Sequence, residues 1–512
     1  MRIEDLFEQP FGTLSDLVHA QAEVQPDRLA LVDANGELNY RGFDSLLDRV
    51  AAALQRDGFE TGSVGAICAL ASIPYAAAFL GVLRAGGAAA PLAPSSTAES
   101  LADMIQDCGA GVLFLDRETA QALAPVSDRL PKLRVALDGS NAGVPFEAWL
   151  AAEGVAPKPV TVEPEQPFNI IYSSGTTGKP KGIVQPNSLR WAQFRRVIYS
   201  ADAVTVVSTP LYSNTTLVSF LPTLANGGTA ILMPKFDAGE FLRLAERHRA
   251  THAMLVPVQY SRLMRHPDFD AHDLSSFKVK FSTSAPFAAE LKTEVLRRWP
   301  GGLVEFYGMT EGGGSCMLEA HLYPHKLGTV GRPMEGHDIR LIDEDGREVA
   351  AGEAGEVVGR SPAMMRGYHN QPDKTREAEW FSPEGERFIR TGDVGRFDAD
   401  GFLTLIDRKK DMIISGGFNI YPSDLEAELV RHPDVAEASV FGVPSEAWGE
   451  TPVAAVVLQP AARVAGEELR AWVNGRVGKT QRLAELRIVE SLPRSPIGKV
   501  LKRELRETFA KG

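Results

Sequence analysis

Residues 173–181 combine hydroxyls, glycines and lysines in a pattern that suits a polyphosphate. Glycines let backbone N–H groups approach an anion, hydroxyls add further donors, and lysines add positive charge. Gly178-Lys179 is followed by Pro180, so no Ser or Thr stands where the common P-loop needs its magnesium ligand. On composition alone, a flexible surface turn explains the stretch as well as a phosphate loop does.

A second stretch, Tyr307-Gly308-Met309-Thr310-Glu311, offers an aromatic ring, a hydroxyl and a carboxylate in close succession. Such groups can stack on a base, bind a phosphate and ligate Mg²⁺. Taken in isolation, an ordinary turn is the alternative interpretation.

Three stretches nearer the C-terminus also carry candidate chemistry. Asp393 follows a glycine and could accept two ribose hydroxyls, although a turn-forming aspartate is the simpler interpretation. The charged cluster 407–411 and the segment 415–420 resemble, by themselves, a solvated turn and a hairpin. Lys499 follows a loop with Pro and Gly that could deliver a fixed cation to an active site. A lone Gly-Lys of this kind is usually ordinary surface, so the five stretches must be judged together.

The elements expected around these stretches alternate between helix and strand in the first part of the chain. Short apolar runs at 64–70, 111–115, 203–208, 230–233 and 253–256 are typical of buried strands, with helical patterns among them. This alternation predicts an α/β fold, with largely parallel sheets covered by helices.

The pattern changes after about residue 333, where short strands and Gly-containing turns predict a β-rich subdomain over about 333–406. Beyond the charged cluster, the elements predict a compact α+β domain of ordinary size. We therefore expect an N-terminal domain over 1–409 and a small C-terminal domain over 410–512. A chain of 512 residues is too long for one core, in agreement with this division.

Composition argues against several other classes of function. The formal net charge is −12 and no segment is obviously basic, which disfavours nucleic acid as a partner. The three cysteines are far apart, offer neither a disulfide framework nor metal-ligand spacing, and fit a reducing cytoplasm. The N-terminus lacks a secretory pattern, and no apolar run reaches about 18 residues, so we expect a cytoplasmic protein without a membrane span.

In their order and spacing, the five stretches resemble the motifs of the adenylate-forming superfamily, which includes acyl-CoA synthetases, amino-acid adenylation domains and luciferases. The resemblance covers nearly the whole chain and is greatest to standalone acyl-CoA synthetases. It implies a small-molecule carboxylic acid as substrate, together with ATP, Mg²⁺ and coenzyme A. The carboxylate would attack the α-phosphate of ATP and release pyrophosphate, and the CoA thiol would then displace AMP. We expect a monomer or a homodimer.

The resemblance assigns a role to each matching residue. Lys499 would bridge the carboxylate and the α-phosphate, where charge grows in the transition state. Thr310 would bind the α-phosphate, and Glu311 would ligate Mg²⁺, so these three are the expected catalytic residues. The residues expected to bind ATP are Ser173, Ser174, Gly175, Thr176, Thr177, Gly178, Lys181, Ser284, Ala285, Tyr307, Gly308, Met309, Thr310, Asp393, Arg408 and Lys499.

The resemblance also implies a mobile C-terminal domain. Lys499 and the CoA-binding face cannot serve both steps from one pose, so this domain would rotate about a hinge at Lys410 between the half-reactions. Ser415, Gly416 and Gly417 would line the path of the CoA pantetheine.

The substrate pocket departs from the family pattern at Ser213, where many relatives carry a histidine, so no histidine gate is assigned. Residues 209–224 contain no Asp or Glu to clamp an α-amino group and no Arg or Lys to hold a second carboxylate. An aryl acid or a medium-chain fatty acid is therefore favoured. The expected pocket residues are Tyr212, Ser213, Val218, Val256, Tyr260, Ser282, Met309, Gly312, Gly313 and Gly314.

Two points stay open. Glycines 312–314 either leave room for a wide acyl group or serve a backbone that needs positive φ. The acceptor of the acyl group could be a carrier protein instead of CoA. A nucleotide-binding regulator that has lost catalysis, and a luciferase-like oxygenase, are the more distant alternatives.

Overall fold

The computed structural model describes residues 3–173, 180–195, 199–408, 411–415, 418–445, 448–460, 462–478, 481–495 and 499–510. The chain divides into two compact units. Unit 1 comprises Met1–Leu327, Pro333–Asp338 and Arg360–Ile389, and unit 2 comprises Gly328–Arg332, Ile339–Gly359 and Arg390–Gly512.

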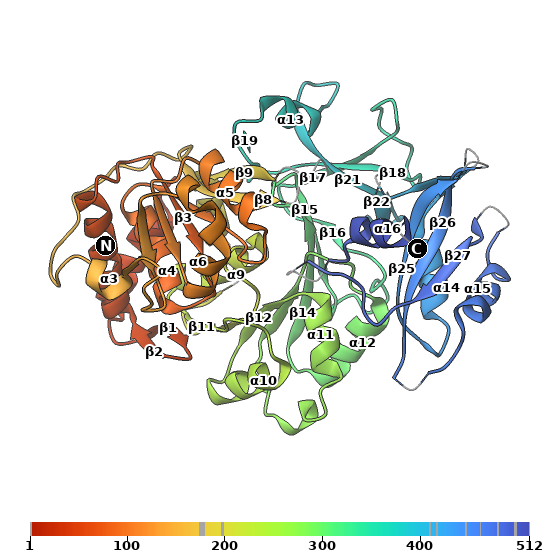
Figure 1. Cartoon of the computed structure of the whole chain (residues 1–512), viewed down its shortest axis with the longest axis horizontal. Coiled ribbons are helices and arrows are strands. Elements are labelled where there is room, and N and C mark those ends of the chain that lie inside the picture. The colour runs from red at the N-terminus through yellow and green to blue at the C-terminus, as the bar shows by residue number, and fades with distance from the viewer. Residues whose placement is uncertain are drawn as a thin grey trace. The chain divides into compact units, whose positions relative to one another are not determined.

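Unit 1 contains a sheet, here sheet A, that is parallel through its centre (Figure 1). Its strand order is β16-β15-β14-β13-β12-β10-β11-β1-β2. The strands from β14 to β1 pair in parallel, whereas β15 and β2 run antiparallel to their neighbours β14 and β1. The bounds are β1 Leu29–Asp33, β2 Gly36–Asn39, β10 Val204–Val207, β11 Thr229–Leu232, β12 His252–Leu255, β13 Val279–Ser282, β14 Gly302–Gly308, β15 Ser315–Glu319 and β16 Arg332–Pro333.

A second sheet of unit 1, sheet B, has the order β19-β9-β8-β4-β3-β5-β6-β7. Its strands from β8 to β7 pair in parallel, whereas β8 and β9 form an antiparallel hairpin, and β19 extends the sheet beside β9. The bounds are β3 Val64–Cys68, β4 Ala88–Pro91, β5 Val112–Leu115, β6 Leu133–Ala136, β7 Val144–Pro145, β8 Pro167–Ser173, β9 Lys181–Pro186 and β19 Gly367–Tyr368.

Helices pack between these two sheets. One continuous core contains side chains of α2, α3, α4 and α9 together with strands of both sheets, such as Leu31 and Leu232 from sheet A and Phe114 and Phe168 from sheet B. The helix bounds in unit 1 are α1 Ile3–Phe7, α2 Leu14–Val24, α3 Tyr40–Arg56, α4 Ile73–Arg84, α5 Ala98–Asp107, α6 Arg117–Leu123, η1 Ala124–Arg129, α7 Phe146–Trp149, α8 Asn187–Phe194, α9 Asn214–Ala225, α10 Ala238–Arg247, α11 Pro257–Met264, η2 Phe269–Ala271, α12 Ala289–Arg298 and α13 Pro372–Glu377.

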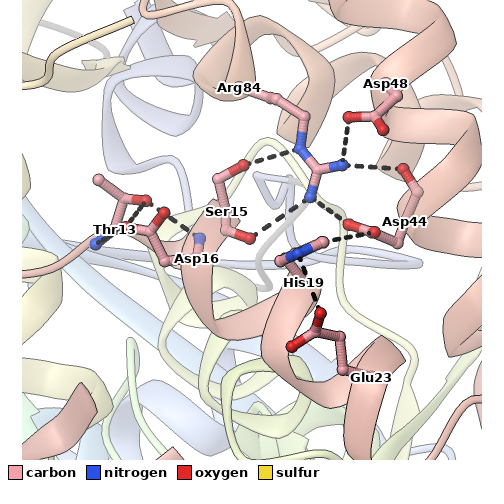
Figure 2. Close-up of polar contacts among 8 residues, drawn as sticks. All are labelled: Thr13, Ser15, Asp16, His19, Glu23, Asp44, Asp48 and Arg84. Atoms are coloured by element: carbon pink, nitrogen blue, oxygen red, sulfur yellow. Dashed lines mark hydrogen bonds and ion pairs between the residues drawn. The ribbon is translucent and has the colours of Figure 1, made fainter. Parts of the chain in front are cut away.

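Arg84, the last residue of α4, ties three of the helices together (Figure 2). Its side chain is 9% exposed and pairs with Asp44 at 2.5 Å and with Asp48 at 2.9 Å, both on α3. Its Nε donates to the Ser15 hydroxyl of α2 at 2.8 Å. A cation at a helix C-terminus also interacts favourably with the helix dipole. Arg84 therefore fixes the packing of α2, α3 and α4 from within their common interface.

Unit 2 contains sheet D, in the order β24-β23-β26-β25 with β27 beside β26. Successive side chains of a strand point to opposite faces. On β26, Ala454 and Val456 accordingly join a core with α14 and α15, whereas Val453 and Ala455 join a core with α16. The bounds are β23 Ile413–Ser415, β24 Phe418–Ile420, α14 Pro422–Val430, β25 Val435–Ser445, β26 Gly449–Leu458, α15 Gly466–Asn474, β27 Glu485–Ile488 and α16 Lys502–Ala510.

A fourth sheet, sheet C, has the order β17-β18-β21-β20 with β22 beside β21, and β21 pairs antiparallel with both β20 and β22. Strand β21 runs from unit 1 into unit 2. β20 pairs with the first half of β21 in unit 1, and β22 pairs with the second half in unit 2. The bounds are β17 Asp338–Ile342, β18 Gly355–Arg360, β20 Glu379–Phe381, β21 Arg387–Phe397 and β22 Leu403–Arg408.

The predicted α/β class is confirmed, and the strands expected at 64–70, 111–115, 203–208, 230–233 and 253–256 are β3, β5, β10, β11 and β12. The division into units groups Ile339–Gly359 and the segment after Arg390 with the C-terminal residues. The domains 1–409 and 410–512 stay a prediction. None of the helices in the described part of the chain combines the length and apolar character that a membrane crossing requires.

Candidate active site

Most predicted ATP and acyl residues of unit 1 follow the carboxyl ends of neighbouring strands of sheet A. Tyr212 and Ser213 follow β10, Val256 follows β12, and Ser284 follows β13, while Tyr307 lies at the end of β14. These strands are parallel, so their carboxyl ends share one edge of the sheet. In sheet A, β10 has β11 as its neighbour on one side and β12 as its neighbour on the other, so the direction of strand order reverses at β10. Such a reversal of strand order is where open α/β sheets bind ligands.

The predicted phosphate loop connects β8 and β9 of sheet B. Ser173 and Lys181 face each other as the last pair of this hairpin, so they flank the base of the loop. Five further predicted residues of the loop lie outside the described residues. They are Ser174, Gly175, Thr176, Thr177 and Gly178.

Tyr368 joins the phosphate loop to the second motif. The Lys181 ammonium lies 4.9 Å from the centroid of its ring, and its hydroxyl donates to Glu311 Oε1 at 2.9 Å. Burial and the neighbouring Glu311 carboxylate raise the pKa of Tyr368, which therefore stays a donor. Lys181 and Glu311, far apart in the chain, thus contact the ring and the hydroxyl of one tyrosine.

The sequence alone does not predict a role for Tyr368. This residue reaches Lys181 because β19 pairs with β9, with Tyr368 opposite Ile183. Nothing in the local sequence marks that pairing, since the two strands are far apart in the chain. The only signal is an aromatic residue after a glycine in a polar segment, which is common in turns.

Glu311 suits the role predicted for it at the metal. Among the described residues, no group of three or more His, Cys, Asp or Glu side chains could hold a metal ion without other ligands. Mg²⁺ is commonly bound through one or two carboxylates together with substrate phosphates. A single, oriented carboxylate beside a phosphate loop therefore fits Mg²⁺ delivered with ATP.

Ser284 has a left-handed backbone conformation, with φ of 80°. Such a conformation is costly for a residue other than glycine and often marks a functional site. Its hydroxyl lies 2.5 Å from the Thr215 hydroxyl, which links the loop after β13 to α9. The predicted neighbour of adenine is thus held by α9, the helix that follows Ser213.

Two predicted acyl-pocket residues of unit 1 pack against apolar clusters, and two more are buried. Val218 packs on a cluster that includes Tyr199, Met254 and Phe281. Met309 packs against a separate cluster around Ile183. Ser213 and Val256 are buried. Burial raises the pKa of Tyr212 to about 12, so its phenol is neutral near pH 7.

Tyr260 and Ser282 point elsewhere. Tyr260 stacks on Phe287 with ring centroids 5.0 Å apart, and its hydroxyl donates to the Phe281 carbonyl at 2.9 Å. The Phe281 side chain belongs to the cluster with Val218, so the next residue of the strand, Ser282, points to the opposite face. The structure does not bring these two side chains together with Val218, and their place in the pocket stays a prediction.

The backbone explains two of the three successive glycines. Gly312 and Gly314 have φ of 75° and 84°. A Cβ on Gly312 would stand 1.9 Å from the Ala363 carbonyl oxygen, so only glycine fits there. These two positions therefore follow the backbone interpretation, and they do not by themselves indicate a wide acyl pocket.

In unit 2, the two predicted ribose-binding side chains lie together. Asp393 on β21 and Arg408 on β22 are paired in register, with Arg408 Nε 3.0 Å from Asp393 Oδ1. The Asp393 amide donates to the Thr391 hydroxyl, which in turn donates to the Val357 carbonyl. Asp393 is thereby held by its own strand and by β18, while Arg408 remains 41% exposed and available to a ligand.

Lys499 is half-buried and lies at the end of a loop in unit 2. Its amide donates to the Ser495 hydroxyl, and its carbonyl accepts from the Ser495 amide at 2.8 Å. Ser415 is buried at the end of β23, opposite Gly449 of β26. The predicted hinge Lys410 and the CoA residues Gly416 and Gly417 lie outside the described residues.

Comparison with known proteins agrees with this arrangement. The profile of the AMP-binding enzyme family matches residues 18–369, and that of the AMP-binding enzyme C-terminal domain matches residues 424–499. Indoleacetate–CoA ligase of Aromatoleum aromaticum is 33% identical over 97% of this chain and 98% of its own. Feruloyl-CoA synthase of an Amycolatopsis species is 32% identical over 96% of this chain and 97% of its own.

Solved structures agree as well. ATP-bound MatB from Rhodopseudomonas palustris has a TM-score of 0.85 and 29% identity, covering 97% of this chain and 99% of that one. The amide bond synthetase McbA from Marinactinospora thermotolerans has a TM-score of 0.86 and 28% identity, with the same coverage.

The fold and the site together define an adenylate-forming enzyme. The chain belongs to the AMP-binding enzyme family, as its sequence motifs predicted.

Proposed function

We propose that this protein is an AMP-forming acid–CoA ligase whose substrate is an aryl acid or a medium-chain fatty acid. The observation that carries the proposal is the convergence of Lys181 and Glu311 on Tyr368. A phosphate-binding cation and a carboxylate suited to Mg²⁺ meet there, next to Thr310. The relatives named indoleacetate–CoA ligase and feruloyl-CoA synthase support an acid–CoA ligase and favour an aryl acid.

In the first step, the task of the protein is to bring two anions together. Lys181 and the phosphate loop would hold the β- and γ-phosphates, which leave as pyrophosphate. Glu311 would hold Mg²⁺, which supplies charge neutralisation on the phosphates. Thr310 would donate to the α-phosphate, and Lys499 would bridge it and the attacking carboxylate, where charge develops.

The nucleoside would be bound by the residues that the motifs assign to adenine and to ribose. Tyr307 would stack on adenine beside Ser284 and Ala285, and Asp393 with Arg408 would bind the ribose. The carboxylate oxygen bonds to the α-phosphorus, and the bond from that phosphorus to the pyrophosphate oxygen breaks.

In the second step, the CoA thiolate attacks the acyl carbon and AMP leaves with the shared oxygen. Rotation about Lys410 would withdraw Lys499 and present Ser415, Gly416 and Gly417 to the pantetheine arm. Cys68, Cys108 and Cys316 are free and buried, which supports a reducing cytoplasm as the place of action. A monomer or a homodimer would suffice, since both steps use residues of one chain.

A pyrophosphate-release screen with CoA present tests the proposal. The acids should include indole-acetic, cinnamic, benzoic, short-chain, medium-chain and long-chain members. We expect release with one of the aryl or medium-chain acids, together with AMP and an acyl-CoA in equal amounts. Glu311→Gln, which keeps the shape of the side chain and removes its charge, should abolish release.

The outcomes separate the alternatives. Pyrophosphate release without CoA-dependent AMP release would indicate a carrier-protein acceptor; one relative, from Streptomyces coeruleorubidus, is named as a fatty acid–[acyl-carrier-protein] ligase. If the protein binds ATP but releases no pyrophosphate with any acid tested, the proposal would be contradicted and a nucleotide-binding regulator would be favoured.

A further inference from the structure

A buried arginine lies at the junction of the phosphate-loop hairpin with α8 and α9. Arg190 on α8 is completely buried. Its guanidinium donates to Asn169 on β8 at 2.9 Å, to Gln185 on β9 at 2.5 Å and to Asn214 at the start of α9 at 2.9 Å. Its other hydrogen-bond acceptor is the Gln193 side chain. Within the described residues, this cation is therefore solvated by neutral amide oxygens and has no carboxylate partner.

A buried, unpaired charge is expensive, so an arginine at this position needs a reason. Burial lowers the pKa of Arg190 to about 9, which still leaves it charged near pH 7. An apolar residue of similar volume would avoid the cost. The stability of the fold alone does not explain the choice.

The guanidinium determines how Gln185 is oriented. Gln185 Oε1 accepts from Arg190 and from Asn169 Nδ2, at 3.0 Å from the latter. A carboxamide has one oxygen and one NH₂ group, so its Nε2 must point the other way. There it donates to the Thr310 carbonyl at 2.7 Å.

The contacts therefore run without a break from the substrate segment to the catalytic motif. Asn214 directly follows Ser213 in the expected acyl segment and binds the guanidinium. The guanidinium holds Gln185, and Gln185 holds Thr310. Thr310 lies beyond the end of β14, so in the described part of the chain its carbonyl accepts from Gln185 and not from a neighbouring strand of sheet A.

We propose that Arg190 and Gln185 are positioning residues for adenylation. The buried guanidinium fixes the Gln185 carboxamide, and the carboxamide holds the Thr310 backbone so that the Thr310 side chain meets the α-phosphate. Neither residue contacts the reacting atoms. The inference rests on the proposed function and adds to it which groups prepare the α-phosphate site.

Gln185→Glu separates positioning from stability. The new side chain keeps an acceptor for Arg190, and indeed offers it a carboxylate, but it has no N–H for Thr310. The ion pair with Arg190 should offset the cost of a carboxylate oxygen beside the Thr310 carbonyl, so we expect a Tm close to that of the wild type. AMP affinity, measured by calorimetry, should fall roughly tenfold, and single-turnover adenylation should slow by roughly tenfold or more. Thioester formation should be unchanged at saturating supplied acyl-adenylate.

Lys280→Met is the matched control. Lys280 is also a fully buried basic side chain bound to neutral oxygens, the carbonyls of Trp299, Pro300 and Gly301, and burial lowers its pKa to about 7. Among the described residues, none of these contacts reaches Thr310. We expect a lower Tm with AMP affinity and adenylation per folded molecule unchanged. If Gln185→Glu does not fold, Gln185→Met removes the carboxamide from the Thr310 carbonyl and leaves Arg190 its acceptors on Asn169, Gln193 and Asn214. It should show the same loss of AMP affinity.

Three results would overturn the inference: wild-type AMP affinity in the folded Gln185 variants, an equal loss in both half-reactions, or an equal loss in Lys280→Met. If the wild-type protein binds AMP but none of the acids tested supports pyrophosphate release, only the proposed function would be contradicted. AMP affinity would then still decide the positioning role. A wild-type protein that binds no AMP would contradict both.

Discussion

At the scale of the residue, the contacts of Tyr368 predict that it controls how well Glu311 binds Mg²⁺. Its hydroxyl orients Glu311, and its ring supports Lys181. Tyr368→Phe removes the hydroxyl and keeps the ring, so it isolates the first contact. We expect the Mg²⁺ concentration for half-maximal pyrophosphate release to rise about tenfold, because one hydrogen bond to a charged ligand is lost. The measurement is a Mg²⁺ titration at saturating ATP.

Tyr40→Phe is the control for that titration. Tyr40 is a buried tyrosine whose hydroxyl donates to the carbonyls of Leu224 and Gly228. Its loss should lower stability and leave the Mg²⁺ dependence unchanged. An unchanged Mg²⁺ dependence in Tyr368→Phe would show that Glu311 does not need this partner.

At the scale of the element, the loop that follows β14 requires glycine at position 312. Gly312→Ala would place a methyl group against the Ala363 carbonyl in a backbone with φ of 75°. We expect Thr310 and Glu311 to shift with it, and adenylation to fall by roughly tenfold or more. Gly336→Ala separates strain from collision, because Gly336 has the same φ and its nearest neighbour, Pro362, would be 3.9 Å away. Equal activity in the two variants would contradict the collision argument.

The helix layer between sheets A and B depends on Arg84. Arg84→Leu removes the hydrogen bonds to Asp44, Asp48 and Ser15 and leaves the half-buried Asp44 with His19 as its remaining partner, which should lower the free energy of unfolding by about 2 kcal/mol. Arg129→Leu, which removes an exposed pairing with Glu99 and Asp103, should cost much less, because solvent screens the exposed charges. Urea unfolding of both variants measures the difference. Equal losses of unfolding free energy would mean that the ion pairs of Arg84 stabilise the fold no more than exposed ion pairs do.

The sequence allowed prediction of the elements and motifs better than of the contacts between them. Apolar runs such as 203–208 predicted strands correctly, because a buried parallel strand needs a continuous apolar segment. Tyr368 and Arg190 could not be predicted, because their partners come from strands and helices distant in the chain. Tyr260 was assigned to the acyl pocket from its position after β12, but that position does not determine which face of the sheet its ring covers.

At the scale of the whole molecule, the proposal requires Lys499 to act in one half-reaction only. Lys499→Ala should slow adenylation by roughly a hundredfold or more, since a cation at the developing charge is lost. Thioester formation from supplied acyl-adenylate should be kept. Stopped-flow measurement of each half-reaction decides this prediction, and an equal fall in both would contradict the assignment.

The central claim is that the carboxylate of the substrate attacks the α-phosphorus of ATP. A substrate whose carboxylate is labelled with heavy oxygen tests this claim most directly. After turnover with CoA, mass spectrometry of the products should find one labelled oxygen in AMP and none in pyrophosphate. Unlabelled AMP, with the label in inorganic phosphate or retained entirely in the acid, would contradict the account.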